Sequence, residues 1–125
     1  MSEQQARILI AEDEANLRLV LQKELERLGY RVQAAPDGEA ALRKLEESNV
    51  DVLLCDINMP RIDGIEALRQ IRAHDATRAI PIVAVTASAM DRDRQQIMAA
   101  GFDAYQSKPL NVKEFMAAVE AILAR

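Results

Sequence analysis

The sequence predicts an α/β protein built on a doubly wound parallel sheet. Short apolar runs of β-type residues alternate with longer stretches whose apolar residues recur at helical spacing, and five such pairs follow one another along the 125 residues. Three of the runs are apolar on both faces, as strands covered by helices on each side must be. Half of all residues are apolar, which suits one domain of common size.

The five apolar runs lie at 8–11, 32–34, 52–55, 82–85 and 104–106. The first, third and fourth are apolar on both faces and are therefore predicted to be central strands. The second and fifth are shorter and more polar, so we expect them at the edges of the sheet. If the second strand lies outside the first, the first and third strands become neighbours.

A helix is predicted after each run, and four of these helices have a clear apolar stripe. The apolar residues that recur every three or four positions are Leu17, Leu21, Leu25 and Leu28; Leu42 and Leu45; Ile65, Leu68 and Ile71; and Phe115, Val119, Ile122 and Leu123. We expect Gly29 to follow the first helix in a left-handed conformation. Asp37 lies in the segment that opens the second helix, and Asn111 and Glu114 are spaced like a capping box.

The fourth helix has a much weaker apolar stripe than the others. Its first turns, at 91–96, are charged or polar throughout, and only Ile97, Met98 and the neighbouring alanines remain to be buried. We therefore expect this helix to be the most weakly anchored element of the fold.

Charge and cysteine content restrict the setting in which the chain works. The 16 Lys and Arg residues against 20 Asp and Glu residues give a formal charge of −4, so no basic stripe for nucleic acid is indicated and no direct contact with it is expected. The single cysteine excludes an internal disulfide and favours a reducing compartment.

Neither a signal peptide nor an apolar run near the ~20 residues that span a bilayer is visible, so we expect a cytoplasmic protein without membrane insertion. Residues 1–125 are predicted to form a single domain, with an ordered core at about 7–124 and no output domain.

Polar residues begin where the predicted strands end. Glu12 and Asp13 directly follow the first run, and Asp56 follows the third. Thr86 follows the fourth run, and Lys108 lies just past the fifth. In an open α/β sheet, ligands bind beyond the carboxyl ends of the strands, where the strand order reverses. With the first and third strands side by side, the three carboxylates converge.

Three carboxylates in one crevice repel one another, at about 4 kcal/mol for two charges ~4 Å apart at an effective dielectric near 20. Lys108 alone cannot neutralise three anions, whereas a divalent cation can. Oxygen ligands suit Mg²⁺, with Mn²⁺ as an alternative. An aspartate beside such an ion, with a lysine and a hydroxyl at hand, is a site for phosphoryl transfer in which the carboxylate attacks in line.

These residues occur in an order that resembles the receiver domain of two-component response regulators over essentially the full chain. The motifs that carry the resemblance are Glu12-Asp13, Asp56-Ile57-Asn58-Met59-Pro60, Asp63-Gly64, Thr86-Ala87 and Lys108-Pro109. The similarity is to single-domain, chemotaxis-regulator-like members. It implies a flavodoxin-like five-stranded parallel sheet of order 2-1-3-4-5 with five helices.

The resemblance implies that Asp56 accepts a phosphoryl group from a phosphohistidine of a sensor histidine kinase or a histidine phosphotransfer protein. It further implies that Asp13 and Asp56 ligate Mg²⁺ directly, that Glu12 does so through water, and that Asn58 does so through its backbone carbonyl. Lys108 would pair with the phosphoryl oxygens. Glu12 stands where many members have aspartate, which lengthens its reach but keeps its charge. We interpret Glu14 as a complement to a helix dipole rather than as a ligand.

In this family a switch follows phosphorylation. The resemblance implies that Thr86 hydrogen-bonds a phosphoryl oxygen and that the aromatic side chain of Tyr105 moves inward. The face made by the fourth helix, fifth strand and fifth helix would then change its partners, among them a downstream protein that the sequence does not identify. Such a protein is a signalling switch, not an enzyme beyond its own phosphorylation and autodephosphorylation.

Three other functions fit these residues less well. A phosphorylation-independent docking module would have no need of the acidic residues, Thr86 and Lys108, all of which are present. A small aspartyl-nucleophile phosphatase of the haloacid dehalogenase type usually has a second aspartate two residues after the first, where this chain has Asn58. A flavin binder is weaker still, because no Ser/Thr-rich phosphate loop follows the first predicted strand.

Overall fold

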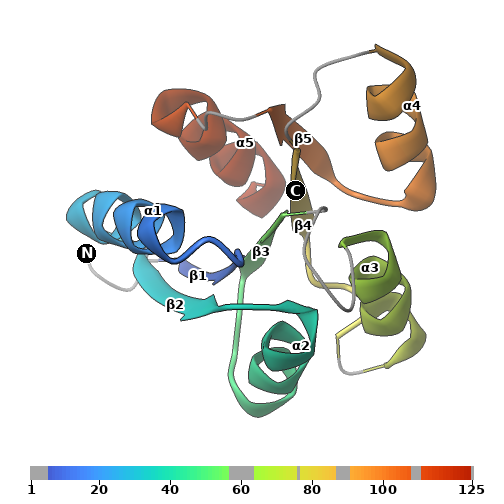
Figure 1. Ribbon diagram of the computed structural model, residues 1–125, viewed down its shortest axis with the longest axis horizontal. Coiled ribbons are helices and arrows are strands. Elements are labelled where there is room, and N and C mark those ends of the chain that lie inside the picture. The colour runs from blue at the N-terminus through green and yellow to red at the C-terminus, as the bar shows by residue number, and fades with distance from the viewer. Residues whose placement is uncertain (1–5, 57–63, 76, 87–90, 108–110, 125) are drawn as a thin grey trace.

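The computed structural model of the chain describes residues 6–56, 64–75, 77–86, 91–107 and 111–124. Within these residues strands and helices alternate strictly (Figure 1). The elements are β1 Arg7–Ala11, α1 Ala15–Arg27, β2 Arg31–Ala35, α2 Gly38–Glu47, β3 Val52–Asp56, α3 Gly64–Ala73, β4 Ile82–Thr86, α4 Asp91–Ala100, β5 Ala104–Ser107 and α5 Val112–Leu123. None of the helices in these ranges is long and apolar enough to cross a membrane.

The strands form one parallel sheet in the order β2-β1-β3-β4-β5, which confirms the predicted fold class. All residues of β3 and β4 are buried, whereas β5 is only partly buried along its whole length, as expected for central and edge strands. The second apolar run is an edge strand as predicted, but the strand extends beyond the run on both sides. β2 has five residues, like β1, because the parallel pairing continues from Arg7 beside Arg31 to Ala11 beside Ala35.

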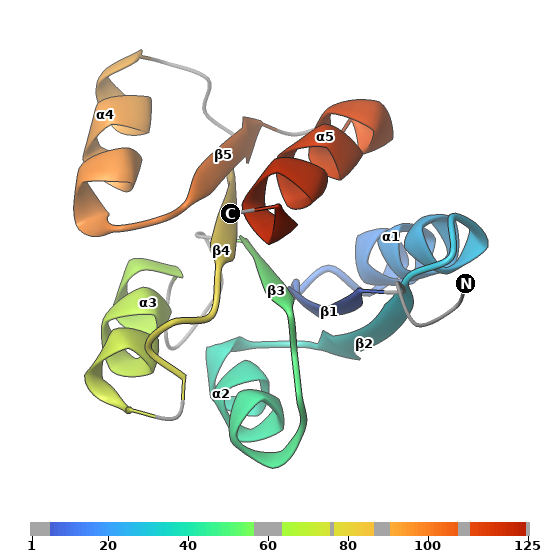
Figure 2. The same cartoon turned by 180° about the vertical axis from the view of Figure 1, so that it is seen from behind.

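Helices cover both faces of the sheet, with α1 and α5 on one face and α2, α3 and α4 on the other (Figures 1 and 2). Alternate residues of each strand enter different cores: Ile8 and Ile10 pack with α1 and α5, whereas Leu9 and Ala11 pack with α2, α3 and α4. This period-2 alternation is why the central strands must be apolar throughout. The sheet is therefore packed against helices on both of its faces.

At two helix ends, residues that were predicted to belong to the apolar face are exposed. Leu28 is the C-cap of α1 and is 41% exposed, and Gly29 beyond it has the left-handed φ of 102° that was expected. Leu123, the last residue of α5, is 45% exposed because its neighbour Ile122 takes the buried position. Successive helical residues point about 100° apart, so both cannot face the core.

The described side chains of α4 bury less than the sequence indicated. Over residues 95–100, whose side chains the structure describes, Ile97 is buried and Met98 is 41% exposed. Met98 therefore does not add to the buried face, contrary to expectation. By contrast, α5 buries Phe115, Val119 and Ile122. The two helices beside β5 thus differ in how firmly they are packed.

Candidate functional site

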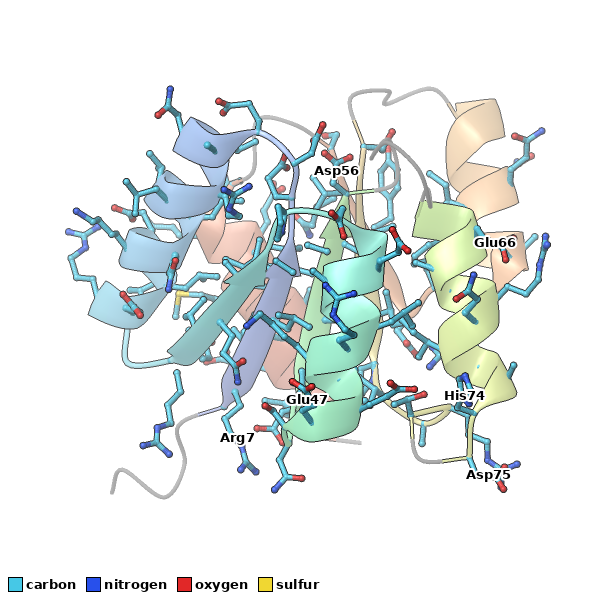
Figure 3. All side chains as sticks on the ribbon, turned by 60° about the horizontal axis from the view of Figure 1, so that its bottom comes forward. Arg7, Glu47, Asp56, Glu66, His74 and Asp75 are labelled. Carbon is cyan, nitrogen blue, oxygen red and sulfur yellow. The ribbon has the colours of Figure 1, made fainter. Side chains whose placement is uncertain are left out.

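The predicted site residues lie at the carboxyl edge of the sheet. Figure 3 shows Asp56 at this edge, at the end of β3 that is opposite to Arg7 and Glu47. β1 and β3 pair with Ala11 beside Cys55, so the residues that follow on each strand, Glu12 and Asp56, emerge side by side. The reversal of strand order around β1 and β3 is thus what brings the acidic residues of two distant segments together.

One carboxylate oxygen from each of Glu12, Asp13 and Asp56 lies within 4.8 Å of the others. Glu12 and Asp56 are each only 2% exposed, whereas Asp13 is exposed. The group is therefore open to solvent on the side of Asp13 and closed on the other sides. At 4.8 Å, two carboxylate charges repel by about 3.5 kcal/mol at an effective dielectric near 20. Such an arrangement needs compensating positive charge.

The loop that carries two of these acids, residues 12–14, is held by several hydrogen bonds. The Glu12 amide donates to the carbonyl of Ala35 at the end of β2, 3.0 Å away. The Glu14 amide donates to Oε2 of Glu12, also at 3.0 Å. The first bond ties the loop to the sheet, and the second fixes the direction of the Glu12 carboxylate.

Glu14 caps the N-terminus of α1 and is not part of the group of three carboxylates. Its carboxylate is the N-cap, accepting from the amides of Asn16 at 3.1 Å and Leu17 at 2.6 Å. A charged cap satisfies amides that have no partner within the helix and interacts favourably with the helix dipole. This agrees with the interpretation of Glu14 as a residue that complements the helix dipole. It is the N-cap, one position before the first residue of α1.

Arg18 is a site neighbour that the sequence analysis missed. From the second turn of α1 its Nη1 donates to the carbonyl oxygen of Glu12 at 2.8 Å and, at the longer distance of 3.5 Å, to that of Asp13. Helical side chains lean toward the N-terminus of their helix, so a long basic residue five positions after Asp13 can reach back to the loop. The spacing thus shows that Arg18 is within reach of the loop, but it does not identify the backbone carbonyls as its acceptors.

Thr86 and Tyr105 lie on the neighbouring strands. Thr86 is the last residue of β4, is 2% exposed, and follows Val85, which pairs with Asp56. Tyr105, in β5, pairs with Ala84 of β4. Its side chain is half-buried against the core that α2, α3 and α4 share with the sheet. Thr86 is thus one strand away from Asp56, and Tyr105 lies on β5, two strands away from it.

Two predicted site residues, Asn58 and Lys108, lie outside the described residues. The same holds for other parts of the motifs, namely Ile57, Met59, Pro60, Asp63, Ala87 and Pro109. The structure therefore describes the part of the site formed by β1, its following loop, and the ends of β3 and β4.

Comparison with known proteins points to one family. The family model described as "Response regulator receiver domain" matches residues 8–120. Among curated proteins, the transcriptional regulatory protein ResD of Bacillus subtilis is 40% identical over 121 residues, which cover 97% of this chain and 49% of ResD. The chain spans about half the length of the curated relatives that it matches first.

Solved structures agree over nearly the whole chain. A putative response regulator from Chloroflexus aurantiacus has a TM-score of 0.90 and 32% identity, covering 98% of this chain and 100% of that one. The receiver domain of a sensor histidine kinase from Pseudomonas aeruginosa has a TM-score of 0.88 and 35% identity, covering 97% and 99%. That structure has a magnesium ion coordinated in its active site cleft.

Proposed function

The chain belongs to the response regulator receiver domain family, and on that premise we propose that it is a Mg²⁺-dependent phosphoryl acceptor with Asp56 as the acceptor residue. The observation that carries the proposal is the meeting of the Glu12, Asp13 and Asp56 carboxylates at one edge of the sheet. Glu12 and Asp56 are almost fully buried, and burying acids together is costly unless a positive charge offsets their repulsion; such costly clusters are typical of functional sites.

The donor set fits Mg²⁺, because it consists of carboxylate oxygens and opens to solvent beside Asp13. We propose that Asp13 and Asp56 hold the ion directly, Glu12 through water, and Asn58 through its backbone carbonyl; Mn²⁺ is an alternative. When bound, the ion would supply the positive charge that offsets carboxylate repulsion and that stabilises negative charge on the transferred group.

In the proposed reaction, an oxygen of the Asp56 carboxylate attacks the phosphorus of a phosphohistidine on a sensor histidine kinase or phosphotransfer protein. The new P–O bond forms as the P–N bond breaks, and the electron pair of that bond leaves with the partner's imidazole. Lys108 would pair with the phosphoryl oxygens. Thr86, buried at the end of the adjacent strand, would donate its hydroxyl to one of them.

We propose that the phosphoryl group then changes the face formed by α4, β5 and α5, which binds a downstream protein. Two features support this: Tyr105 lies on β5 within the face and Thr86 on the neighbouring strand β4, and α4 buries only Ile97 among its described side chains. A helix with so little buried surface can change its packing for a few kcal/mol.

The proposal is tested by incubating the protein with Mg²⁺ and acetyl phosphate and measuring its intact mass. We expect a gain of one phosphoryl group that requires both Mg²⁺ and Asp56, and that is therefore lost in Asp56→Asn. Asp75→Asn is the matched control, because Asp75 is exposed at the opposite end of the sheet (Figure 3). Absence of the adduct with every donor would favour a docking module, and repeated turnover of phosphate monoesters would favour a phosphatase.

A further inference from the structure

Arg18 holds the backbone of two of the three acidic residues at once. We propose that it is a positioning residue that prepares Glu12 and Asp13 for the metal ion, an inference that rests on the proposed function. Its Nη1 lies 2.8 Å from the Glu12 carbonyl oxygen and 3.5 Å from that of Asp13. One guanidinium nitrogen thus spans the peptide groups of both adjacent acids.

The two acidic residues of the loop differ in burial, and the contact with Arg18 supports the exposed one. Glu12 is buried and is already tied to β2 through its amide, 3.0 Å from the Ala35 carbonyl. Asp13 is exposed on the loop. Arg18 is half-buried and extends from a helix that packs Leu21 and Leu25 into the core. It therefore connects the exposed part of the loop to a firmly packed element.

The charge and the hydrogen bonds of Arg18 predict opposite effects on the metal ion. As a nearby cation, Arg18 repels Mg²⁺, so removing its charge alone would tighten binding. As a hydrogen-bond donor it keeps two ligand residues in place, and losing such a supporting group typically weakens metal affinity about 10–100-fold. Partial exposure weakens the electrostatic effect, because solvent screens the charge. The positioning effect should therefore dominate.

The same helix offers a matched control. Arg27 is also on α1, is exposed, and pairs with Glu24 one turn earlier, with 2.8 Å between Nη2 and Oε1. Arg27→Met removes the same charge and a surface hydrogen bond while leaving the loop untouched. Any change that it shares with Arg18→Met reflects the net charge of the protein, and the difference between them isolates the loop contact.

The test measures the dissociation constant for Mg²⁺ by calorimetry and by the rise of the thermal midpoint with Mg²⁺ concentration. For Arg18→Met we expect binding about tenfold weaker than in the parent. Arg18→Lys should fall between the two, because the lysine ammonium can still donate to a loop carbonyl but lacks the rigid fork that holds the arginine in place. Arg27→Met should match the parent. At saturating Mg²⁺, the rate of labelling by acetyl phosphate should return close to the parent rate in both Arg18 variants.

Equal or tighter Mg²⁺ binding by Arg18→Met would overturn the inference, as would a lower thermal midpoint with an unchanged dissociation constant, which would make Arg18 merely structural. If Arg18→Met fails to fold, Arg18→Lys decides by the same criteria. Failure of the proposed function is distinguishable, because the parent protein would then bind no Mg²⁺ or take no phosphoryl group, and the inference would fall with it.

Discussion

The repulsion among the three carboxylates makes a prediction that can be measured without any partner protein. Asp13→Asn removes one charge and keeps the shape of the side chain. In the absence of metal, we expect the variant to be more stable than the parent. Asp13 is the exposed member of the group, so the substitution disturbs no buried packing. The comparison therefore reports on charge and not on a cavity.

The magnitude follows from the geometry. The Asp13 carboxylate lies within 4.8 Å of those of Glu12 and Asp56, so each pair repels by about 3.5 kcal/mol at an effective dielectric of 20 and by about 0.9 kcal/mol at 80. Because Asp13 is exposed, the lower value applies more nearly, and the unfolded chain keeps part of the repulsion from Glu12. We expect a gain of about 1–2 kcal/mol in the free energy of unfolding.

The assays are urea unfolding and thermal unfolding, both followed by circular dichroism, in EDTA and again in millimolar Mg²⁺. In EDTA, each 1 kcal/mol should raise the thermal midpoint by about 3–5 °C for a domain of this size. In Mg²⁺ the difference in the free energy of unfolding between variant and parent should narrow. The free energy of the parent rises by about 1.4 kcal/mol when the ion is present at ten times its dissociation constant, and that of the variant rises by less.

Asp75→Asn serves as the control, since the Asp75 side chain is 95% exposed and its contact with Arg78 is a surface ion pair. It should change the free energy of unfolding by no more than about 0.5 kcal/mol under either condition. The reasoning is refuted if Asp13→Asn is no more stable than the parent in EDTA. It is also refuted if Mg²⁺ stabilises the variant as much as it stabilises the parent.

Three further predictions concern groups away from the acidic cluster. Burial, reinforced by the charge of Glu120, raises the pKa of Tyr30. The neutral phenol therefore stabilises the fold below pH ~10, and this stabilisation is lost as the pH rises further. Above pH ~10, Tyr30→Phe should accordingly lose less stability than the parent. Tyrosinate absorbance at 295 nm checks this, because Tyr30→Phe should remove a phenol whose pKa is raised above its ordinary value. Arg72→Met should lower the free energy of unfolding by about 1–3 kcal/mol, measured with urea. The reason is that the Arg72 guanidinium lies 3.0 Å from the Asp103 carboxylate and also donates to backbone carbonyls. An unchanged free energy would show that solvent replaces these bonds. Gly101→Ala should lower the free energy of unfolding by about 1–2 kcal/mol, with an unchanged denaturant slope, because the φ of 115° at this position disfavours any residue with a Cβ. Steric contact is not the cause, since the added Cβ would lie 3.7 Å from Leu68. An unchanged free energy would mean that the turn relaxes.

Strand order and site location could be predicted because both depend on patterns that side chains determine. Runs that are apolar on both faces must be central strands, and the acids that follow them must meet at the carboxyl edge when the first and third strands are neighbours. The exposed positions of Leu28, Met98 and Leu123 could not be predicted in the same way. Helical periodicity says which face of a helix is apolar, but not how far along its length the sheet covers it.

The contact of Arg18 escaped the sequence analysis for a different physical reason. Its acceptors are the backbone carbonyls of Glu12 and Asp13, and every residue has a carbonyl whatever its side chain. A sequence pattern identifies complementary side chains, such as acids that gather around a cation. It does not identify a donor whose targets are peptide groups, unless the turn between strand and helix is already known.

The unequal packing of α4 and α5 bears on how the proposed switch can work. Burying one isoleucine contributes about 1.5–3 kcal/mol, and Ile97 is the buried residue among the described side chains of α4. A hydrogen bond from Thr86 to a charged phosphoryl oxygen contributes about 1.5–3 kcal/mol, which is comparable. Helix α5 buries Phe115 and Val119 completely, so the same energy cannot displace it. On the proposed mechanism, α4 therefore moves while α5 stays in place as the fixed half of the binding face.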